Sequence, residues 1–411
     1  MNFKRTNNIV GWVICIIACT VYIMTMEATG SLWDCGEFIS TAAKVQIPHP
    51  PGAPLFVLLG RLFIIFFGQK HAAIGVNTMS ALASGFTILF LFWTITHFAR
   101  RLMVKPGESI SGEKMIAIMG AGIVGALAYT FSDSFWFSAV EGEVYAMSSF
   151  FTAIVFWAIL KWEHESEEAY ADRWIVFIAF MMGLSIGVHL LNLLTIPAIV
   201  MVYYFKRYKV TPMGTFWAFI IGCAITGLIQ KFIIQDTIKA SGYMDVFFVN
   251  SLHLPFFTGF AFYFIAIVGA LVYALRNPKF GIYGPLILIA SVIVIPAFVD
   301  ADGGGMVFFK ILVAAAVIAI PWLVKQFGGN LLAAPVVHAT KLTIYCTLFL
   351  LLGYSTYITT MVRSTANPAV DMYNVDNPIS LVGYLGREQY GDFPLIYGQV
   401  FTARPTEYKE T

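Results

Sequence analysis

Charged residues are scarce in this chain of 411 residues. Asp, Glu, Lys and Arg together make up 12% of the sequence, whereas hydrophobic residues make up 59%. A soluble globular domain carries about 25% charged residues, so this composition argues against one. The 25 Lys and Arg are nearly balanced by 23 Asp and Glu. A protein that neutralises nucleic-acid phosphates needs a basic face, so nucleic acid is excluded as the leading partner.

Cysteine is also scarce, and the chain shows no repeat with a period of roughly 20 to 50 residues. Of the five cysteines, Cys15, Cys19, Cys223 and Cys346 lie inside apolar segments, which leaves Cys35 alone in a loop. This distribution offers no framework of paired thiols, so no structural disulfide is expected.

The chain is rich in apolar runs long enough to cross a bilayer. The first run, residues 9–26, ends in Met26-Glu27 without a small-residue cleavage site, so we expect a retained span and not a signal peptide. We predict an all-α polytopic membrane protein with about eleven transmembrane helices, at residues 9–26, 72–99, 115–131, 144–160, 174–188, 190–205, 213–229, 254–275, 280–299, 306–324 and 342–362. The fifth and sixth runs are short and meet at His189, which favours a tight or broken hairpin.

The basic residues of the loops set the orientation. They are concentrated on the side that also holds the N-terminus, which predicts a cytoplasmic N-terminus in the inner or plasma membrane and an external C-terminus. Residues 1–362 then form the transmembrane domain, with an external loop at 27–71, and residues 363–411 form an external tail. The apolar stretch 53–67 inside the loop predicts an interfacial or re-entrant helix. The tail has turn formers and no core pattern, so we interpret it as the beginning of a further domain.

Two acidic residues follow the first span directly. Asp34 and Glu37 are three residues apart, so they share one face if the segment is helical. Carboxylates beside a low-dielectric region are costly and tend to be functional, and one of them can serve as a general base. The alternative is an ordinary solvated loop.

The same loop continues into a proline-rich turn, residues 46–55, that surrounds His49. This histidine is a candidate to bind phosphate or shuttle a proton, unless the prolines only redirect the chain. A second acidic pair, Glu141 and Glu143, precedes Tyr145 at the outer end of the fourth span. Aromatic neighbours leave little room for solvent there, so both acids need polar partners.

Two further sites carry weaker signals. His189 and Asn192 lie in the outer hairpin, where either could contact an anionic headgroup, although a lone apolar-face histidine is more often a core residue. Asp300 and Asp302 resemble part of an oxygen-ligand loop for a divalent cation, but two acids are too few, so we interpret the segment as a turn and expect no metal site.

Three motifs together resemble one family. They are D-x-G-E from Asp34, H-P-P-G-x-P-L from His49 and E-V-Y from Glu143, and the tail from Asn377 to Asp392 adds to the likeness. The family is that of GT-C-type membrane glycosyltransferases that includes the vertebrate protein O-mannosyltransferase of plexins and many uncharacterised bacterial members. Its members usually continue into a large external domain that is missing here.

The resemblance implies an inverting glycosyltransferase without a cofactor. It would move a sugar, mannose in the family, from a polyprenyl-phosphate donor to an external protein or glycan acceptor, such as a Ser or Thr hydroxyl. Asp34 would be the base, with Glu37 beside it, and Glu37 and Glu143 would position the acceptor or the sugar hydroxyls. Candidates to bind the donor or acceptor are His49, Arg61, Glu141, Glu143, Tyr145, His189 and Asn192.

Two other classes of function stay open. In a secondary transporter, the acids and histidines near broken spans would be ion or substrate ligands, but such groups are usually near the bilayer midplane, often in inverted repeats. Here the acids gather at one face. A non-catalytic scaffold that retains the fold is the third alternative.

Overall fold

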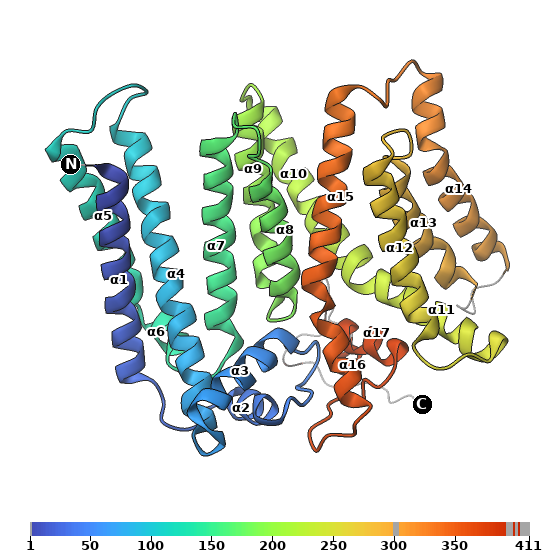
Figure 1. The fold of residues 1–411 in the computed structure, drawn as a ribbon, viewed down its shortest axis with the longest axis horizontal. Coiled ribbons are helices and arrows are strands. Elements are labelled where there is room, and N and C mark those ends of the chain that lie inside the picture. The colour runs from blue at the N-terminus through green and yellow to red at the C-terminus, as the bar shows by residue number, and fades with distance from the viewer. Residues whose placement is uncertain (1, 299–303, 392–397, 399–401, 403–411) are drawn as a thin grey trace.

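The bundle is built from helices. The computed structural model describes residues 2–298, 304–391, 398 and 402, and within these ranges it contains no strand, only one isolated bridge between Ile47 and Asp371. Each predicted span overlaps a helix, which confirms the all-α membrane class (Figure 1). The bounds differ most for the predicted span 342–362, whose helix ends at Tyr354. These helices are α1 (Phe3–Thr25), α4 (Ala72–Met103), α5 (Gly112–Thr130), α7 (Val144–Glu165), α8 (Arg173–Ile186), α9 (Ile196–Arg207), α10 (Pro212–Leu228), α12 (Thr258–Arg276), α13 (Tyr283–Ala297), α14 (Gly304–Gln326) and α15 (Ala334–Tyr354).

Nine helical stretches in the described ranges are long and apolar enough to cross a bilayer. The predicted spans at 174–188 and 280–299 correspond to α8 and α13, which have 14 and 15 residues and are short for a full crossing. The hairpin at His189 is broken as expected, because a 3₁₀ segment, Leu190–Thr195, precedes α9. Short helices inside the bundle are tolerated where neighbouring helices cover them.

Close backbone contact holds the short helix α8 against α15. A Cβ atom added at Gly183 would overlap the carbonyl oxygen of Leu350, and one at Gly353 would lie 2.5 Å from the backbone nitrogen of Leu184. Small residues at such a crossing let two helices pack through their backbones, which stabilises association inside a bilayer. Larger side chains at either glycine are therefore excluded.

Several shorter helices lie at the end of the bundle opposite the N-terminus (Figure 1). They are α2 (Cys35–Lys44), α3 (Pro54–Phe67), α6 (Asp133–Ala139), α11 (Thr237–Leu252), α16 (Ile358–Ser364) and α17 (Pro378–Gly386). Helix α3 is the short apolar helix predicted for residues 53–67. Cys35, which we expected in a loop, is the first residue of α2 and is fully buried. Asp300 and Asp302 fall outside the described residues.

One predicted loop is helical instead. After α10 the chain continues through a π-helical stretch, Ile229–Asp236, directly into α11. Charged residues such as Lys231 and Asp236 interrupt the apolar run, but they pair with each other at 2.7 Å, so the helix can continue. Buried Asp245 on α11 then accepts hydrogen bonds from the backbone N–H groups of Phe257 and Gly259, and α12 begins at Thr258, four residues later than predicted.

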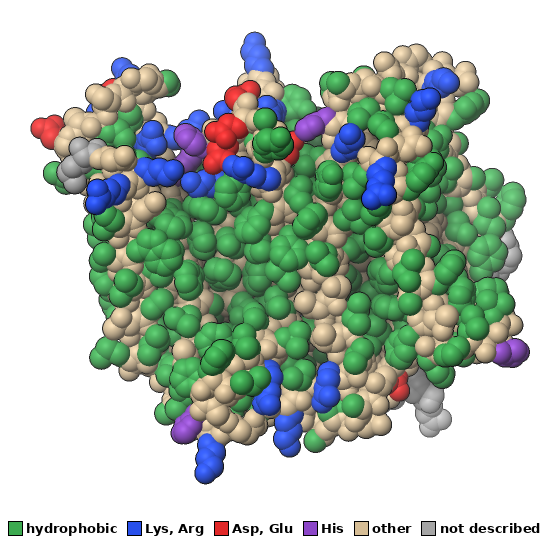
Figure 2. Space-filling view, in the orientation of Figure 1, with side chains coloured by type: hydrophobic (Ala, Val, Ile, Leu, Met, Phe, Trp, Pro, Cys, Tyr) green, Lys and Arg blue, Asp and Glu red, His purple; other side chains and the backbone are tan. Residues whose placement is uncertain are grey.

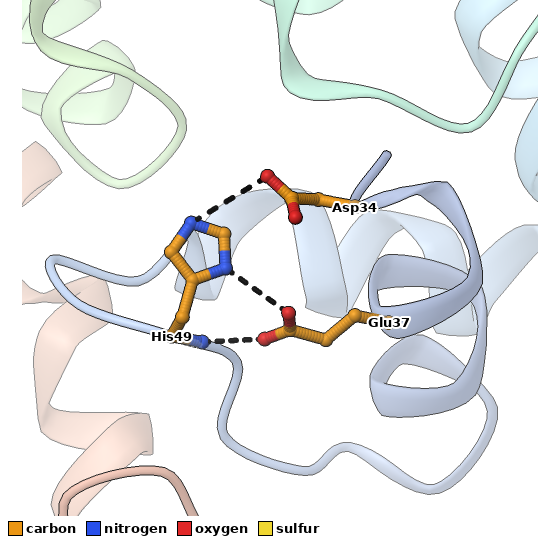
Figure 3. Close-up of side chains that lie close together, drawn as sticks. All are labelled: Asp34, Glu37 and His49. Carbon is orange, nitrogen blue, oxygen red and sulfur yellow. Dashed lines mark hydrogen bonds and ion pairs between the residues drawn. The ribbon is translucent and has the colours of Figure 1, made fainter. Parts of the chain in front are cut away.

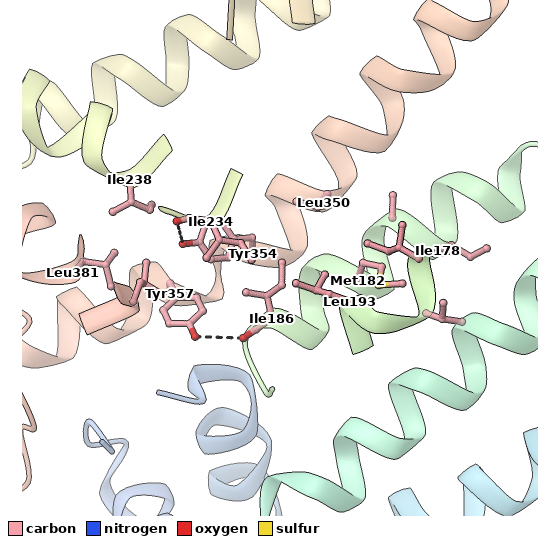
Figure 4. Close-up of a cluster of buried hydrophobic side chains, with 14 of the residues drawn as sticks. Ile178, Met182, Ile186, Leu193, Ile234, Ile238, Leu350, Tyr354, Tyr357 and Leu381 are labelled. Atoms are coloured by element: carbon pink, nitrogen blue, oxygen red, sulfur yellow. Dashed lines mark hydrogen bonds between the residues drawn. The ribbon is translucent and has the colours of Figure 1, made fainter. Parts of the chain in front are cut away.

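A buried apolar cluster joins the bundle to this end layer (Figure 4). It combines residues of α8, α11, α15 and α17, among them Ile186, Ile238, Leu350 and Leu381. Two tyrosine hydroxyls are satisfied inside it. Tyr354 donates to the carbonyl of Ile234 at 2.9 Å, and Tyr357 donates to that of Ile186 at 3.3 Å. Because buried hydroxyls need such partners, the cluster fixes how α15 meets the end layer.

The orientation can be tested by labelling. Lys44 at the end of α2 and Lys105 after α4 are both exposed and lie at opposite ends of the bundle. With a cytoplasmic N-terminus, a cysteine at position 44 should react with a membrane-impermeant maleimide in intact cells, whereas one at position 105 should react only after permeabilisation. Both cysteines are introduced into a Cys35→Ser background, and the Cys35→Ser protein without an added cysteine is the negative control. Labelling of position 105 alone would reverse the orientation.

Candidate active site

Three side chains from the first loop converge at the end of the bundle opposite the N-terminus (Figure 3). Asp34 precedes α2, Glu37 lies in its first turn, and His49 lies in the proline-rich turn that follows. The backbone N–H of His49 donates to Glu37 Oε1 at 2.5 Å, and His49 Nδ1 is 3.1 Å from Glu37 Oε2. On the other side of the ring, Nε2 is 3.9 Å from Asp34 Oδ2. The histidine thus bridges the two acids.

The exposure of the two acids differs. The Asp34 side chain is 53% exposed, and although it precedes α2 it makes no capping hydrogen bond to that helix. Glu37 is 26% exposed, and both of its oxygens face His49. A base must reach a substrate hydroxyl. Asp34 is the more accessible of the two acids, whereas His49 engages both oxygens of Glu37.

These contacts shift the ionisation of the pair in opposite directions. Burial raises the pKa of Glu37, but the hydrogen bonds from the ring and backbone of His49 outweigh it, so the pKa is lowered overall. The hydrogen bond to Glu37 raises the pKa of His49 against the opposing effect of burial, and the charges of Glu37, Asp34 and Glu143 raise it further. The arrangement therefore favours a protonated His49 between two carboxylates.

The second acidic pair lies beside this cluster. Glu141 and Glu143 are each only 4% exposed, in the turn between α6 and α7. Burial raises the pKa of Glu141, although Ser31 and Cys35 donate hydrogen bonds to it. Burial also raises the pKa of Glu143 to about 7, and the charges of Asp34 and Glu141 contribute. One Glu143 oxygen accepts the backbone N–H of Val144 at 2.8 Å and caps α7.

We expect Glu143→Gln to be more stable than the parent at pH 8. Burial makes the charged form of Glu143 unfavourable, so the folded protein holds a proton that the unfolded chain has lost, and stability falls as the pH rises from 4.5 towards 7. Gln removes this penalty, on the order of 1 to 3 kcal/mol, and keeps an oxygen for the α7 cap. The melting temperature in detergent should rise at pH 8 and not at pH 5. A lower melting temperature at pH 8 would contradict the assignment.

The proline-rich turn is held by parts of the chain far away in sequence. Tyr384 on α17 donates its hydroxyl to the carbonyl of Pro48 at 2.5 Å, and Tyr357 donates to that of Pro51 at 3.0 Å. Gly52 has φ +75°, and a Cβ there would overlap the Tyr384 hydroxyl, so glycine is required. The tail also pairs with the turn, because Ile47 donates to the carbonyl of Val370 at 3.1 Å. Residues 370–384 therefore complete the site, whatever follows them.

His189 lies at the border of the site, where its ring faces that of Tyr145 at 5.4 Å between centroids. Its Nδ1 accepts the backbone N–H of Leu191, so the neutral ring carries its proton on Nε2. Burial and the charge of Arg387 lower its pKa, which favours that neutral form. His189 therefore offers one N–H donor, and exposed Arg387 offers a cation nearby.

Two predicted site residues lie elsewhere. Asn192 is fully buried and donates to Ser185 Oγ at 3.0 Å, so it is a packing residue of the hairpin. Arg61 donates to the carbonyl of Ala43 at 2.6 Å and to Gln69 at 2.9 Å, at the far end of α2 from Glu37. Sequence analysis gave no role to Tyr357, Tyr384 or Arg387, although the last two lie in the tail motif that carried the resemblance.

Comparison with known proteins confirms the resemblance. Residues 34–212 match the family model described as the protein O-mannosyl-transferase TMEM260 N-terminal domain. A protein O-mannosyl-transferase tmem260 of Dictyostelium discoideum is 26% identical over 213 residues, which are 50% of this chain and 24% of that protein. Its counterpart in Mus musculus is 26% identical over 166 residues, 40% of this chain and 21% of that protein. The chain thus spans about a quarter or less of these relatives. No solved structure matches it.

Proposed function

Because this chain is related to the GT-C-type family of protein O-mannosyl-transferases, we propose that it transfers mannose from a polyprenyl-phosphate donor to an external acceptor hydroxyl. The observation that carries this proposal is the constellation of Asp34, Glu37 and His49, which lies at the start of the matched region. A lipid-linked donor suits a polytopic bundle, since the donor arrives from the bilayer. A Ser or Thr of a protein is the proposed acceptor, by analogy with the names of the relatives.

In the proposed mechanism, Asp34 takes the proton of the acceptor hydroxyl as that oxygen attacks the anomeric carbon. The bond from the anomeric carbon to the phosphate oxygen breaks, and polyprenyl phosphate leaves with the electron pair. Attack from the face opposite the phosphate inverts the anomeric configuration. Glu143, which is buried and has a pKa raised to about 7, keeps a partly protonated carboxyl near neutral pH and would position a sugar or acceptor hydroxyl, and Glu141 would support it.

The leaving phosphate needs its own donors on the opposite side of the sugar from Asp34. His49 Nε2 is 3.9 Å from the Asp34 carboxylate, which is too close for groups on opposite faces of a sugar ring, since an inverting glycosidase separates such groups by about 6.5 to 9.5 Å. We therefore assign His49 to orient Asp34. The donor Nε2–H of His189 and the Arg387 guanidinium are the proposed phosphate ligands, with Tyr145 beside them.

Direct assay tests this function. Purified protein in detergent should convert polyprenyl-phosphate mannose to polyprenyl phosphate, by transfer to an acceptor peptide or by slow hydrolysis. Arg387→Gln should lower the rate with little change in folding, because the side chain is exposed. The position of the acids at one end of the bundle favours a transferase over a transporter. A transporter would move a substrate across the membrane without consuming the polyprenyl-phosphate donor.

We expect transfer to survive EDTA. A monophosphate leaving group can be stabilised by fixed side-chain donors, without a metal ion. The ligand atoms of Asp34, Glu37 and His49 do lie within 4.8 Å of one another, close enough to surround an ion. However, Glu37 and His49 already bond directly to each other. Loss of activity with EDTA, restored by Mn²⁺ or Mg²⁺, would instead assign a metal to these three residues.

A further inference from the structure

A cavity with basic walls lies at the end of the bundle opposite the acidic site. It has a volume of about 520 Å³ and is formed by the start of α1 and the ends of α4 and α7. Basic side chains from all three helices line it, namely Lys4, Arg100 and Lys161, with His164 beside them. Figure 2 shows a band of basic side chains at this end, above the apolar flank of the bundle.

Tryptophans line the cavity together with these cations. Trp12 and Trp93 lie 6.3 Å apart between ring centroids, and Trp93 and Trp157 lie 5.8 Å apart, so one row of indoles crosses α1, α4 and α7. Tryptophan concentrates at the boundary between hydrocarbon and headgroups. The cavity therefore lies at headgroup depth, with its cations on the aqueous side of the row.

The cations of this cavity have no carboxylate partner within ion-pair distance among the described residues. Arg100 lies over the Phe3 ring at 4.9 Å, and Lys161 lies over the Trp157 ring at 5.3 Å. Two acids, Glu165 and Glu168, also line the cavity. Arg173 and Trp174 already donate to Glu165 at 2.9 and 2.8 Å, so the three cations face one further carboxylate, that of Glu168. An excess of positive charge is thus left for an external anion.

Besides His97 Nε2, which lies 3.5 Å from a Glu163 oxygen, two buried polar atoms of lining residues make no hydrogen bond. The Asn7 side-chain oxygen and the Trp93 indole nitrogen are shielded and make no hydrogen bond. Buried polar groups without partners are uncommon, and those in a cavity point to a ligand or water that pairs with them. An acceptor and a donor beside three cations match a phosphate that carries a hydroxylated headgroup.

We propose that this cavity binds the headgroup of an anionic phospholipid, with phosphatidylglycerol as the probe. The phosphate would lie among Lys4, Arg100 and Lys161, and a glycerol hydroxyl would donate to Asn7. Basic pockets between transmembrane helices bind anionic headgroups in this way. The bound lipid would hold α1 against α7, which α4 otherwise separates. The inference does not depend on the transferase assignment.

The test compares two triple variants in nanodiscs. Lys4→Gln, Arg100→Gln and Lys161→Gln remove the cations of the cavity, whereas Lys105→Gln, Lys206→Gln and Lys209→Gln remove the same charge at the same end outside it. Each cation near anionic lipid contributes roughly fivefold in affinity, so the cavity triple should bind phosphatidylglycerol about 100-fold more weakly. Native mass spectrometry should find one fewer retained phosphatidylglycerol, and the control triple should match the parent.

Other outcomes would overturn the proposal. Equal retention by the cavity triple and the parent would show that the lipid binds elsewhere. Competition by millimolar inorganic phosphate against retained lipid would assign a soluble phosphate ligand. If the triple does not fold, Arg100→Gln alone should still bind about fivefold more weakly. Trp93→Phe keeps every charge and removes the N–H donor, so a melting temperature that still rises fully with phosphatidylglycerol would remove this contact from the site.

Discussion

Asp34→Asn is expected to lower the rate of mannose transfer at least about 100-fold, which is the typical cost of losing a general base. Asn has nearly the same size but cannot accept the proton of the acceptor hydroxyl. The variant should fold normally. The Asp34 side chain is half exposed and makes no capping bond to α2. Among the described residues its one ion-pair partner is His49, 3.9 Å away, so its replacement costs little stability.

The control for Asp34→Asn is Asp133→Asn. Asp133 is another exposed acid at the same end of the bundle, in the first turn of α6. The Asp133→Asn variant should transfer mannose at the parent rate. Donor consumption and melting temperature should be measured for both variants in the same detergent. If Asp34→Asn retains transfer within about twofold of the parent while Glu143→Gln loses it, Glu143 is the base and the proposed assignment is wrong.

The spans were predictable because bilayer thickness imposes an apolar length that composition alone reveals. Residues 72–99 and 144–160 are runs of this kind, and α4 and α7 contain them. Helix α11 was not predictable by the same rule. It carries Lys239 and Asp245. The buried Asp245 accepts backbone N–H groups at the start of α12, a contact that apolar periodicity does not encode.

The acidic site was partly predictable because three of its residues are close together in the sequence. Asp34, Glu37 and His49 lie in one short loop, so few arrangements keep them apart. The prediction that Glu143 lies near these residues required the assumption that two loops are on the same side of the membrane. The structure places both loops at the same end of the bundle.

The hydrogen bonds that hold the proline-rich turn could not be predicted from the sequence. Tyr357 and Tyr384 bind backbone carbonyls, so no side chain in the turn marks them as partners. Arg61 and Asn192 were selected for their chemistry, but in the structure Arg61 donates to the Ala43 carbonyl and the Gln69 side chain, and Asn192 donates to Ser185.

Glu37→Gln is expected to separate positioning from base catalysis. Both carboxylate oxygens of Glu37 face His49, and Gln supplies only one acceptor, so either the backbone N–H of His49 or its ring loses its bond. The released turn can move the ring that orients Asp34. A misplacement of about 1 Å costs up to about 100-fold in rate, so we expect a loss of roughly 10- to 100-fold.

The pH dependence of stability gives Glu37→Gln a second signature. Because the pKa of Glu37 is lowered in the folded protein, the carboxylate stabilises the fold at pH values above its ordinary pKa of 4.5. This stabilisation is lost as the pH falls through the lowered pKa. Because the pKa of His49 is raised in the folded protein, the protonated ring stabilises the fold at pH values below its ordinary pKa of 6.5. This stabilisation is lost as the pH rises through the raised pKa. The parent should therefore exceed Glu37→Gln in melting temperature most clearly between about pH 4.5 and 6.5, with a smaller difference at pH 9.

The matched control for this comparison is Glu113→Gln, which changes an exposed glutamate in the first turn of α5 at the opposite end. It should leave both the rate and the pH dependence of melting unchanged. A Glu37→Gln protein with the stability difference but a parent-like rate would show that the Glu37–His49 pair only holds the turn. A lost rate without the stability difference would mean that Glu37 contacts substrate directly, and its role would change from positioning residue to catalytic residue.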